Sequence, residues 1–278
     1  MAGPGLHPEV LPDELANALS DARDRLGVVA RRVLYFSSIG STNDVAAKLA
    51  DDPDAEGTVV VAEAQSSGRG RRGRSWFSPA GAGLYVSVVL APHRARQSPD
   101  RATTLLTLTA GLALADAIQR TTGLRPTIKW PNDLLVGRRK LAGILAEGIV
   151  ASSASGPLHA VVLGYGINVR AAAYPPDLAD RVTALEPELG RPIDRATLCA
   201  ETLASLAAWY GDLLDGRFDV ILDAWRERAP GSRGARVSWE TAEGLRSGTT
   251  AGVDEMGALL VRIGDVTERI VAGELTWT

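Results

Sequence analysis

The segment TVVVAEAQSSGRGRRGRSWFSPAGAGLYVSVVLAP, from Thr58 to Pro92, holds two apolar runs that flank a loop rich in arginine and glycine. The runs, Thr58–Glu63 and Leu84–Leu90, are rich in β-branched residues, which is typical of strands. The loop GRGRRGR (Gly68–Arg74) places four arginines and three glycines in seven residues. Glycine lets backbone N–H groups approach a ligand closely, and guanidinium groups match phosphate and carboxylate oxygens. The pattern predicts two strands joined by a loop whose groups suit a polyanion.

Two other interpretations of this loop stay open on its residues alone. A solvated charged loop without a ligand is the more common reason for such a run, and a nucleic-acid-binding patch is the second. The loop is not a P-loop, because the G-x-x-x-x-G-K-[ST] spacing and its lysine are absent from it.

Composition places the 278-residue chain among ordinary globular proteins, with 45% apolar and 23% charged residues and a net charge of −3. Cys199 is the single cysteine, so no internal disulfide forms, and its apolar helical surroundings indicate a core residue rather than a nucleophile. The weakly polar stretch Thr103–Ile118 is shorter than the ~20 residues that span a bilayer, so we expect a buried helix. The N-terminus lacks the features of a signal peptide, and we expect a cytoplasmic protein.

Periodicity predicts the remaining elements. Helices are expected near Pro12–Leu26, Asp100–Thr121, Arg195–Leu214 and Asp219–Arg228. Thr127–Val150 is expected to form two strands joined by a turn at Gly137–Arg139, and Leu158–Val169 another strand. A linker is expected at Pro230–Gly234, before short β-like runs that predict a small all-β module.

A second polar cluster is KWPNDLLVGRRKLAG, from Lys129 to Gly143. Pro131 indicates a strand end or a bulge, which would expose Asn132 and Asp133. Lys140 is a compact cation that can follow charge moving on a carboxylate or a phosphate. Taken singly, each of these residues is more often an ordinary surface group.

Two further motifs carry polar groups at the ends of elements. In GYGINV (Gly164–Val169) the glycines allow close backbone approach, although a β-bulge with a capping asparagine is the favoured interpretation of this motif taken alone. In SIGSTND, Ser41 or Thr42 is expected to cap a helix. The other hydroxyl and amide groups of Ser41, Thr42 and Asn43 are then available to hydrogen-bond a small polar head group.

Together these motifs resemble those of the biotin protein ligases. GSTND, GRGRRGRSWFSP, KWPNDL, RKLAGILAE and GYGINV follow one another in the order of that family, and the resemblance is strong from Phe36 to Asn168. The lipoate ligases are similar in fold but lack the GRGRRGR and KWPND pair. The resemblance implies an α+β, class II synthetase-like fold: a central mixed β-sheet with helices on one side, and a small C-terminal SH3-like β-barrel. We expect a catalytic domain over residues 1–232 and the barrel over 233–278.

The resemblance also implies roles for individual residues. Those expected to bind biotin are Ser41, Thr42, Asn43, Gln65, Gly68, Arg69, Gly70, Arg71, Trp76, Lys140 and Gly143. Those expected to bind ATP are Arg71, Arg72, Arg74, Trp76, Asn132, Lys140 and Asn168, with the two asparagines at the adenine. Lys140, Arg71 and Asp133 are the expected catalytic residues. No aromatic residue follows Tyr174 in the segment where some relatives place an adenine-stacking tryptophan.

The implied reaction is ATP-dependent formation of biotinyl-5′-AMP, followed by transfer of biotin to a lysine of a biotin carboxyl carrier protein domain. ATP, Mg²⁺ and biotin are the expected small molecules, with no prosthetic group and no membrane partner. About 35 residues precede the resemblance, too few for a three-helix DNA-reading unit, so we expect the form without an N-terminal DNA-binding domain and no specific DNA binding. A non-catalytic nucleic-acid-binding protein is the alternative from another class, and a lipoate–protein ligase is a more distant one.

Overall fold

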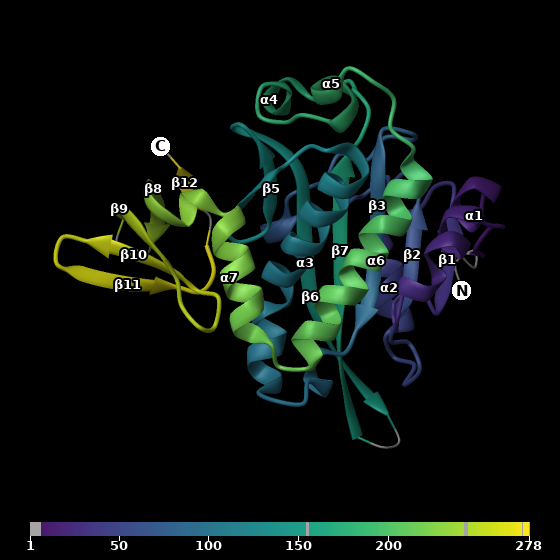
Figure 1. Ribbon diagram of the computed structural model, residues 1–278, viewed down its shortest axis with the longest axis horizontal. Helices are drawn as coiled ribbons and strands as arrows, with labels where there is room; N and C mark the ends of the chain where they lie inside the picture. Colours follow the sequence, from purple (N-terminus) through teal and green to yellow (C-terminus); the bar gives the residue numbers. More distant parts are fainter. Residues whose placement is uncertain (1–6, 154–155, 242–243, 274, 278) are drawn as a thin grey trace.

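The computed structural model describes residues 7–153, 156–241, 244–273 and 275–277, and its main body is built on a seven-stranded mixed sheet. The strand order is β1-β2-β3-β7-β6-β5-β4 (Figure 1), in which β1 and β2 are parallel and every other neighbouring pair is antiparallel. The strands are β1 Arg32–Phe36, β2 Thr58–Ala62, β3 Gly83–Leu90, β4 Thr127–Lys129, β5 Asp133–Val136, β6 Arg139–Ser153 and β7 Gly156–Asn168.

Helices cover both faces of this sheet. They are α1 Asp13–Ala22, α2 Thr42–Leu49, α3 Pro99–Thr122, α4 Pro176–Ala179, α5 Leu185–Leu189, α6 Arg195–Leu214 and α7 Phe218–Arg228. The large core lies between the sheet and the layer that contains α1, α3, α6 and α7 (Figure 1). The prediction of helices on one side is therefore incomplete, because α2 packs Ala46 on the opposite face, against Phe36 and Val60.

Alternation along the strands explains this two-sided arrangement. In β3, Val86 and Val88 belong to the core of the helical layer, whereas Ser87 points to the face that carries α2. Successive side chains of a strand alternate between faces. In β7 the same alternation sends Tyr165 to the helical layer and leaves Gly164 and Gly166 on the other face. At these positions of β3 and β7, one face therefore packs into the large core and the other presents small residues.

The central helix α3 is long and apolar enough to cross a membrane, but 72% of its most apolar window is buried inside the protein. It packs against α6, and Leu105, Leu112 and Ile118 have no exposed surface. The prediction of a buried helix is confirmed, although the helix is longer than the stretch on which the prediction was based. Cys199 on α6 is also a core residue, and burial raises the pKa of its thiol to about 12, which leaves it unreactive near neutral pH.

Several element boundaries differ from the predictions. The segment from Thr127 forms three strands rather than two, because the chain breaks at Pro131 between β4 and β5. The expected linker after Pro230 is one 3-10 turn, Pro230–Ser232, and β8 follows it at once. The short helices α4 and α5 were not predicted. Ser41 is the N-cap of α2, but its side chain makes no capping hydrogen bond.

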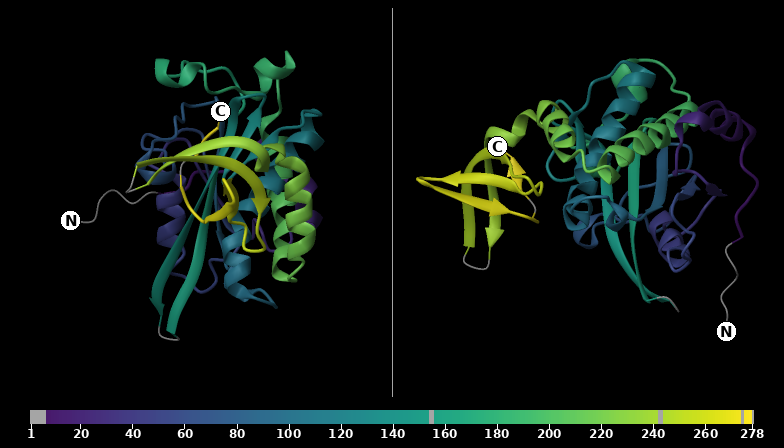
Figure 2. Two further views of the ribbon diagram at one scale, coloured as in Figure 1. Left: turned by 90° about the vertical axis from the view of Figure 1, so that its left-hand side faces the viewer. Right: turned by 60° about the horizontal axis from the view of Figure 1, so that its bottom comes forward.

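The C-terminal module is a separate five-stranded antiparallel sheet beside α7 (Figures 1 and 2). Its strands are β8 Arg233–Thr241, β9 Gly244–Val253, β10 Leu259–Ile263, β11 Val266–Ile270 and β12 Thr276–Trp277, in the order β11-β10-β9-β8-β12. Trp130 Nε1 donates to the Gly257 carbonyl at 3.0 Å, and Arg101 Nε donates to the Glu255 carbonyl at 2.8 Å. These bonds fix the module against the β4 end of the main body.

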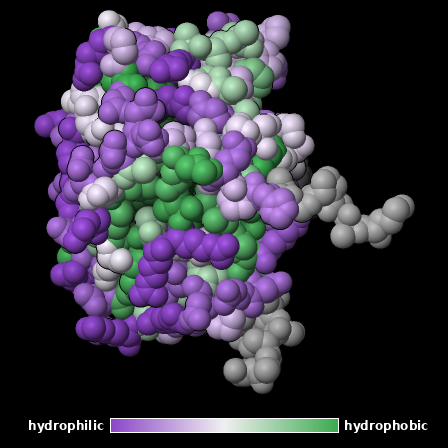
Figure 3. All heavy atoms as spheres, turned by 90° about the vertical axis from the view of Figure 1, so that its right-hand side faces the viewer, coloured by the Kyte–Doolittle hydropathy of each residue, from purple (hydrophilic) through white to green (hydrophobic). Residues whose placement is uncertain are grey.

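The opposite end of the sheet is the β1 edge, which Figure 3 views from outside. Apolar residues gather there among hydrophilic ones, and Val10 is 90% exposed. Glu9 covers part of the edge, because its N–H donates to the Tyr35 carbonyl at 2.9 Å.

A substitution at Gly57, in the turn before β2, tests the packing of the chain at this edge. Gly57 has a φ of 85°, and a Cβ there would lie 1.9 Å from the backbone oxygen of Val28. Gly123, which follows α3, has a φ of 81° and open space around it. Substitution by alanine strains both backbones by roughly 1–2 kcal/mol, but only Gly57→Ala adds a backbone clash. We expect Gly57→Ala to lower the free energy of unfolding by several kcal/mol more than Gly123→Ala, measured by chemical denaturation. Equal losses would contradict this close approach.

Candidate active site

Two adjoining cavities lie on the face of the sheet that carries α2. The first is about 50 Å³ and the second about 490 Å³. Residues that line both are Gly70, Arg71, Trp76, Asn132 and Lys140. A molecule that spans the two cavities would therefore pass these five residues.

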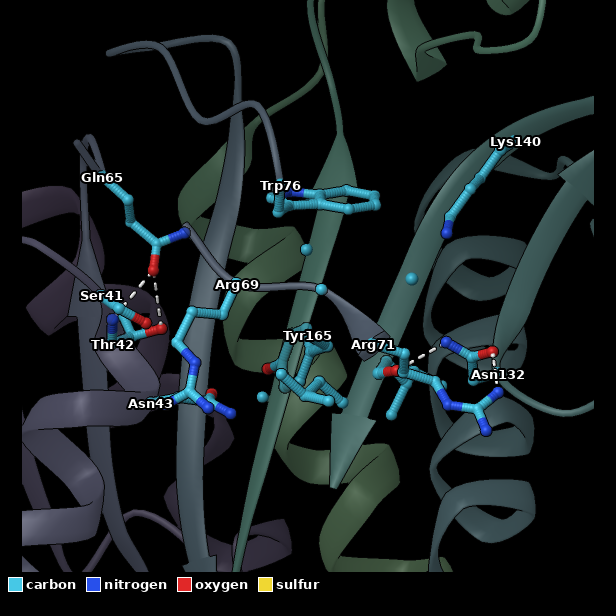
Figure 4. Close-up of a pocket in the computed structure, with 16 residues that line it drawn as sticks. Ser41, Thr42, Asn43, Gln65, Arg69, Arg71, Trp76, Asn132, Lys140 and Tyr165 are labelled. Atoms are coloured by element: carbon cyan, nitrogen blue, oxygen red, sulfur yellow. Dashed lines mark hydrogen bonds between the residues drawn. The ribbon is translucent and has the colours of Figure 1, made fainter. Parts of the chain in front are cut away.

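The floor of the first cavity is glycine backbone. Gly143 on β6 pairs with Gly166 on β7, and the Trp76 indole covers both (Figure 4): an ideal Cβ would lie 2.2 Å from Trp76 Nε1 at Gly166 and 2.9 Å from Trp76 Cζ3 at Gly143. Asn43 covers Gly164 in the same way, with its Oδ1 only 1.9 Å from the ideal Cβ position. Any side chain at these positions would displace the residue above it. The register of β7 is regular through Asn168, so the alternative interpretation of GYGINV as a β-bulge is wrong.

One end of the cavity is a hydrogen-bonded cluster at the start of α2. Gln65 Oε1 accepts from the Thr42 N–H at 2.8 Å and from Thr42 Oγ1 at 3.1 Å, so the Gln65 side chain satisfies a free N–H of this helix (Figure 4). Gln65 Nε2 in turn donates to Ser78 Oγ at 2.9 Å. Ser87 Oγ donates to Asn43 Oδ1 at 2.6 Å and lies 2.8 Å from Thr42 Oγ1. Buried Ser41, Thr42 and Asn43 thus form a rigid polar end wall.

The arginine loop folds back over this site as a tight hairpin. Gly70 N–H donates to the Arg74 carbonyl at 2.7 Å, and Trp76 N–H donates to the Gly68 carbonyl at 2.8 Å. Arg72 has a φ of 56°, in the left-handed region that non-glycine residues rarely adopt. Strained backbone of this kind is common where a loop serves a ligand.

Three of the four loop arginines, Arg69, Arg71 and Arg74, have partners in the structure. Arg69 lies 2.5 Å from Asp44 and also contacts Glu147, and its hydrogen bond with the Asp44 carboxylate raises the pKa of Arg69. Arg71 donates to Asn132 Oδ1 at 3.1 Å (Figure 4). Carboxylates therefore offset part of the positive charge that the sequence places on the loop.

Lys140 stands where the two cavities meet. Its ammonium is 2.7 Å from Asp133 Oδ1, an ion pair without hydrogen-bond alignment, and 5.2 Å from the centroid of the Trp76 ring. Its backbone is fixed from the other side, because Lys140 N–H donates to the Arg181 carbonyl at 2.8 Å. The lysine is thus held at the boundary between the cavities while its side chain remains 30% exposed.

The two asparagines expected at the adenine also make bonds within the protein. Asn132 Nδ2 donates to the Ile144 carbonyl at 2.8 Å, and Asn168 Nδ2 donates to the Thr183 carbonyl at 3.0 Å. Both residues line the second cavity. Part of each amide is therefore already used to join segments of the site.

The structure brings together nearly all the residues singled out in the sequence. The first cavity is lined by all those expected at biotin except Gly68, and the second by all those expected at ATP, together with Asp133. Gly68 lines neither of these cavities; an ideal Cβ there would be 2.4 Å from the Trp76 carbonyl oxygen, so a side chain at this position would prevent the close approach of the two ends of the loop.

Other residues of the site were not predicted. Ser78, Ser87, Asp44 and Glu147 hold the predicted side chains, and Phe77, Arg138 and Arg181 line the second cavity. Two of them could have been found from the sequence, because Ser87 and Glu147 are polar residues within the apolar runs of β3 and β6. Tyr174 lines this cavity too, with its ring 5.7 Å from that of Phe77, so the site contains aromatic side chains without a later tryptophan.

Comparison with known proteins agrees with this geometry. Residues 35–168 match the model of the biotin/lipoate A/B protein ligase family. The biotin–[acetyl-CoA-carboxylase] ligase of Mycobacterium tuberculosis is 35% identical over 277 residues, which cover 98% of this chain and 96% of that protein. The bifunctional ligase/repressor BirA of Bacillus subtilis is 32% identical over 263 residues, which cover 92% and 78%.

A solved structure extends the agreement to three dimensions. The biotin protein ligase from Aquifex aeolicus in complex with biotin and ATP has a TM-score of 0.74 and 26% identity, over 89% of this chain and 99% of that one. The chain belongs to the biotin/lipoate A/B protein ligase family, and within that family it is a biotin protein ligase.

The glycine floor gives a direct prediction. Gly164→Ala should displace Asn43 and reduce the affinity for biotin roughly tenfold or more, since overpacking at a closed site costs about 1–3 kcal/mol. Gly148→Ala, on β6 with open space around it, is the matched control and should bind biotin normally. Isothermal titration calorimetry with biotin checks both. A Gly164→Ala protein with unchanged affinity would show that Asn43 does not need its position over Gly164.

Proposed function

We propose that this chain activates biotin with ATP and transfers it to a lysine of a biotin carboxyl carrier protein domain. The observation that carries the proposal is the meeting of a small polar-ended cavity and a large cationic cavity at Lys140 and Arg71. The curated relatives in Mycobacterium tuberculosis and Paracoccus denitrificans are named as ligases of biotin to acetyl-CoA carboxylase, which supports this acceptor class.

The reaction has two steps, adenylation of biotin and transfer of the biotinyl group. A carboxylate oxygen of biotin attacks the α-phosphorus of ATP, and the bond to the bridging oxygen breaks, which releases pyrophosphate and leaves biotinyl-5′-AMP. The lysine amine of the acceptor then attacks the acyl carbon, loses a proton, and displaces AMP. Lys140 and Arg71 lie where the carboxylate and α-phosphate would meet, and their charges stabilise the oxygens that gain negative charge.

The first cavity suits a cyclic urea. Such a head group has one carbonyl acceptor and two N–H donors, and the hydroxyl and amide groups of Ser41, Thr42, Asn43 and Gln65 form the end wall. The Trp76 indole supplies an apolar surface along the path to Lys140, suited to the hydrocarbon part of biotin.

The second cavity suits a nucleoside triphosphate. Seven of its lining residues are cationic (Arg71, Arg72, Arg74, Lys129, Arg138, Lys140 and Arg181) and two are acidic (Asp133 and Asp180), an excess of five positive charges on a chain of net charge −3. Within the described ranges, the side chains of Arg72, Arg138 and Arg181 make no hydrogen bond or ion pair, which leaves their guanidinium groups for a ligand. Phe77 and Tyr174 offer ring surfaces on which an adenine can pack.

We also propose that ATP enters with Mg²⁺. Mg²⁺ in nucleotide sites is held by one or two carboxylates and the substrate phosphates, and Asp133 and Asp180 supply carboxylates here. Within the residues that the structure describes, no three His, Cys, Asp or Glu side chains gather as a metal cluster, which fits a metal carried by its nucleotide. The ion supplies further neutralisation of phosphate charge when bound.

The division into a catalytic domain, residues 1–232, and a C-terminal module, residues 233–278, belongs to the same proposal. The module has its own sheet, yet Leu275 and Gly273 line the second cavity, so its removal should weaken ATP binding. We further propose a cytoplasmic location and no sequence-specific DNA binding. Retention of a promoter fragment at physiological salt would contradict the last point.

Biotin-dependent exchange of labelled pyrophosphate into ATP is the deciding test. The purified chain should catalyse this exchange with biotin and not with lipoate, and should then label an added carrier domain. Exchange with lipoate alone would favour a lipoate ligase, and no exchange together with salt-sensitive nucleic-acid binding would favour the non-catalytic alternative.

Lys140→Ala should slow formation of the adenylate by roughly tenfold to a thousandfold, the scale of losing one charge-stabilising donor. Lys48→Ala, an exposed lysine on α2, is the control and should keep the rate of the unsubstituted protein. Single-turnover quench measurements check both. An unchanged rate in Lys140→Ala would remove Lys140 from the mechanism.

Arg138→Ala and Arg181→Ala should each raise the KM for ATP about tenfold, because a hydrogen bond to a charged group contributes about 1.5–3 kcal/mol. Affinity for AMP, which lacks the β- and γ-phosphates, should change little. Arg32→Ala, an exposed arginine on the far edge strand β1, controls for the loss of charge. Equal loss of ATP and AMP affinity would place these arginines elsewhere than at the terminal phosphates.

A further inference from the structure

Glu147 is a carboxylate that touches two different parts of the site. It projects from β6 on the face of the glycine floor, where its Oε2 accepts from Asn43 Nδ2 at 2.7 Å. Its other oxygen, Oε1, contacts the guanidinium of Arg69 from the arginine loop. One side chain therefore joins the polar end wall of the first cavity to the loop that covers it.

The Asn43 side chain lies across three strands. Its amide passes directly over Gly164 of β7, with Oδ1 bonded to Ser87 on β3 at 2.6 Å and Nδ2 bonded to Glu147 on β6. Strands β3, β7 and β6 are neighbours in that order. Without a side chain on Gly164, the amide is held only by its partners at the two ends.

The chemistry of those two partners is unequal. An ionised carboxylate only accepts hydrogen bonds, whereas a serine hydroxyl both donates and accepts. Glu147 therefore requires the NH₂ group of Asn43 on the β6 side, and Ser87 then donates to the carbonyl oxygen. The orientation of this amide decides which groups the end wall presents to a ligand.

The same carboxylate acts on the loop. Arg69 lies between Glu147 and Asp44, which is on α2, so the two acids share one guanidinium. These three residues, which we call the Arg69 cluster, tie the loop both to the sheet and to the helix that begins with the end wall. Their side chains are 27–50% exposed, a range in which an ion pair contributes little to stability but can still bias the position of a loop.

We propose that Glu147 is a positioning residue that orients Asn43 for the biotin head group and, with Asp44, holds the arginine loop closed over the intermediate. The proposal rests on the proposed function of the site. Asp44 shares only the second role, because its side chain pairs with Arg69. Neutralising Glu147 should therefore have different consequences from neutralising Asp44.

Glu147→Gln and Asp44→Asn separate the two roles. Both variants remove a charge partner of Arg69, so both should release biotinyl-AMP faster, by about two- to fivefold for an exposed ion pair. Both should also be cut faster by trypsin after the loop arginines in the absence of any ligand. Only Glu147→Gln should raise the Kd for biotin, by about tenfold, since only it frees the Asn43 amide to turn. Glu227→Gln, an exposed acid on α7, is the control for the loss of a negative charge.

The readouts keep the inference apart from the function on which it rests. Biotin affinity is measured by calorimetry and loop cutting by limited trypsin digestion, neither of which needs catalysis, and release of the adenylate is measured by filter binding. If the unsubstituted protein binds no biotin, the proposed function fails, while loop cutting still tests the Arg69 cluster. If both variants match the control in trypsin cutting, or if Asp44→Asn loses as much biotin affinity as Glu147→Gln, the inference is overturned.

Discussion

Close packing of side chains on bare backbone is the constraint on which the site depends. Asn43 lies on Gly164, and Trp76 lies on Gly166 and Gly143, at distances that no Cβ would permit. Because the three glycines belong to paired positions of β6 and β7, the regular register of the sheet also sets the separation of Asn43 and Trp76. The first cavity is the space left between these two side chains. Its shape therefore follows from the register of the sheet.

Polar contacts then connect this glycine floor to the start of α2 and to the arginine loop. Gln65 satisfies the start of α2, Glu147 and Asp44 hold Arg69, and Asn132 holds Arg71. Each contact joins a side chain of the first cavity to a different element. These contacts explain how a loop of like charges can fold back on the site, because carboxylate and amide oxygens accept from its guanidinium groups. Among the described residues, the side chains of Arg72, Arg138 and Arg181 in the second cavity have no internal partner, and this distinguishes the second cavity from the first.

Local pattern could predict the individual strands and the long buried helix, and the resemblance to the biotin protein ligases implied the mixed sheet and the residues that surround both cavities. β-branched runs flank the arginine loop, and Pro131 breaks the chain where β4 ends. The sequence could not predict that α2 lies on the face opposite the other helices, since a short amphipathic helix can pack on either side. It also missed Glu147, Asp44 and Ser87, whose roles arise from contacts with residues 25 to 104 positions away.

By itself, the sequence determined which chemical groups are present and in what order: the cationic loop, the KWPND turn, Lys140 and the glycines of β7. Motif spacing is a local property of the sequence, so it can be identified without knowledge of the fold. Only the tertiary structure decided which of these groups meet. Strand alternation placed the glycines on the face away from the core, the neighbouring positions of β3, β7 and β6 brought Ser87, Asn43 and Glu147 together, and the C-terminal module reached the second cavity. Such pairings depend on the packing of distant segments, and no local pattern of residues specifies them.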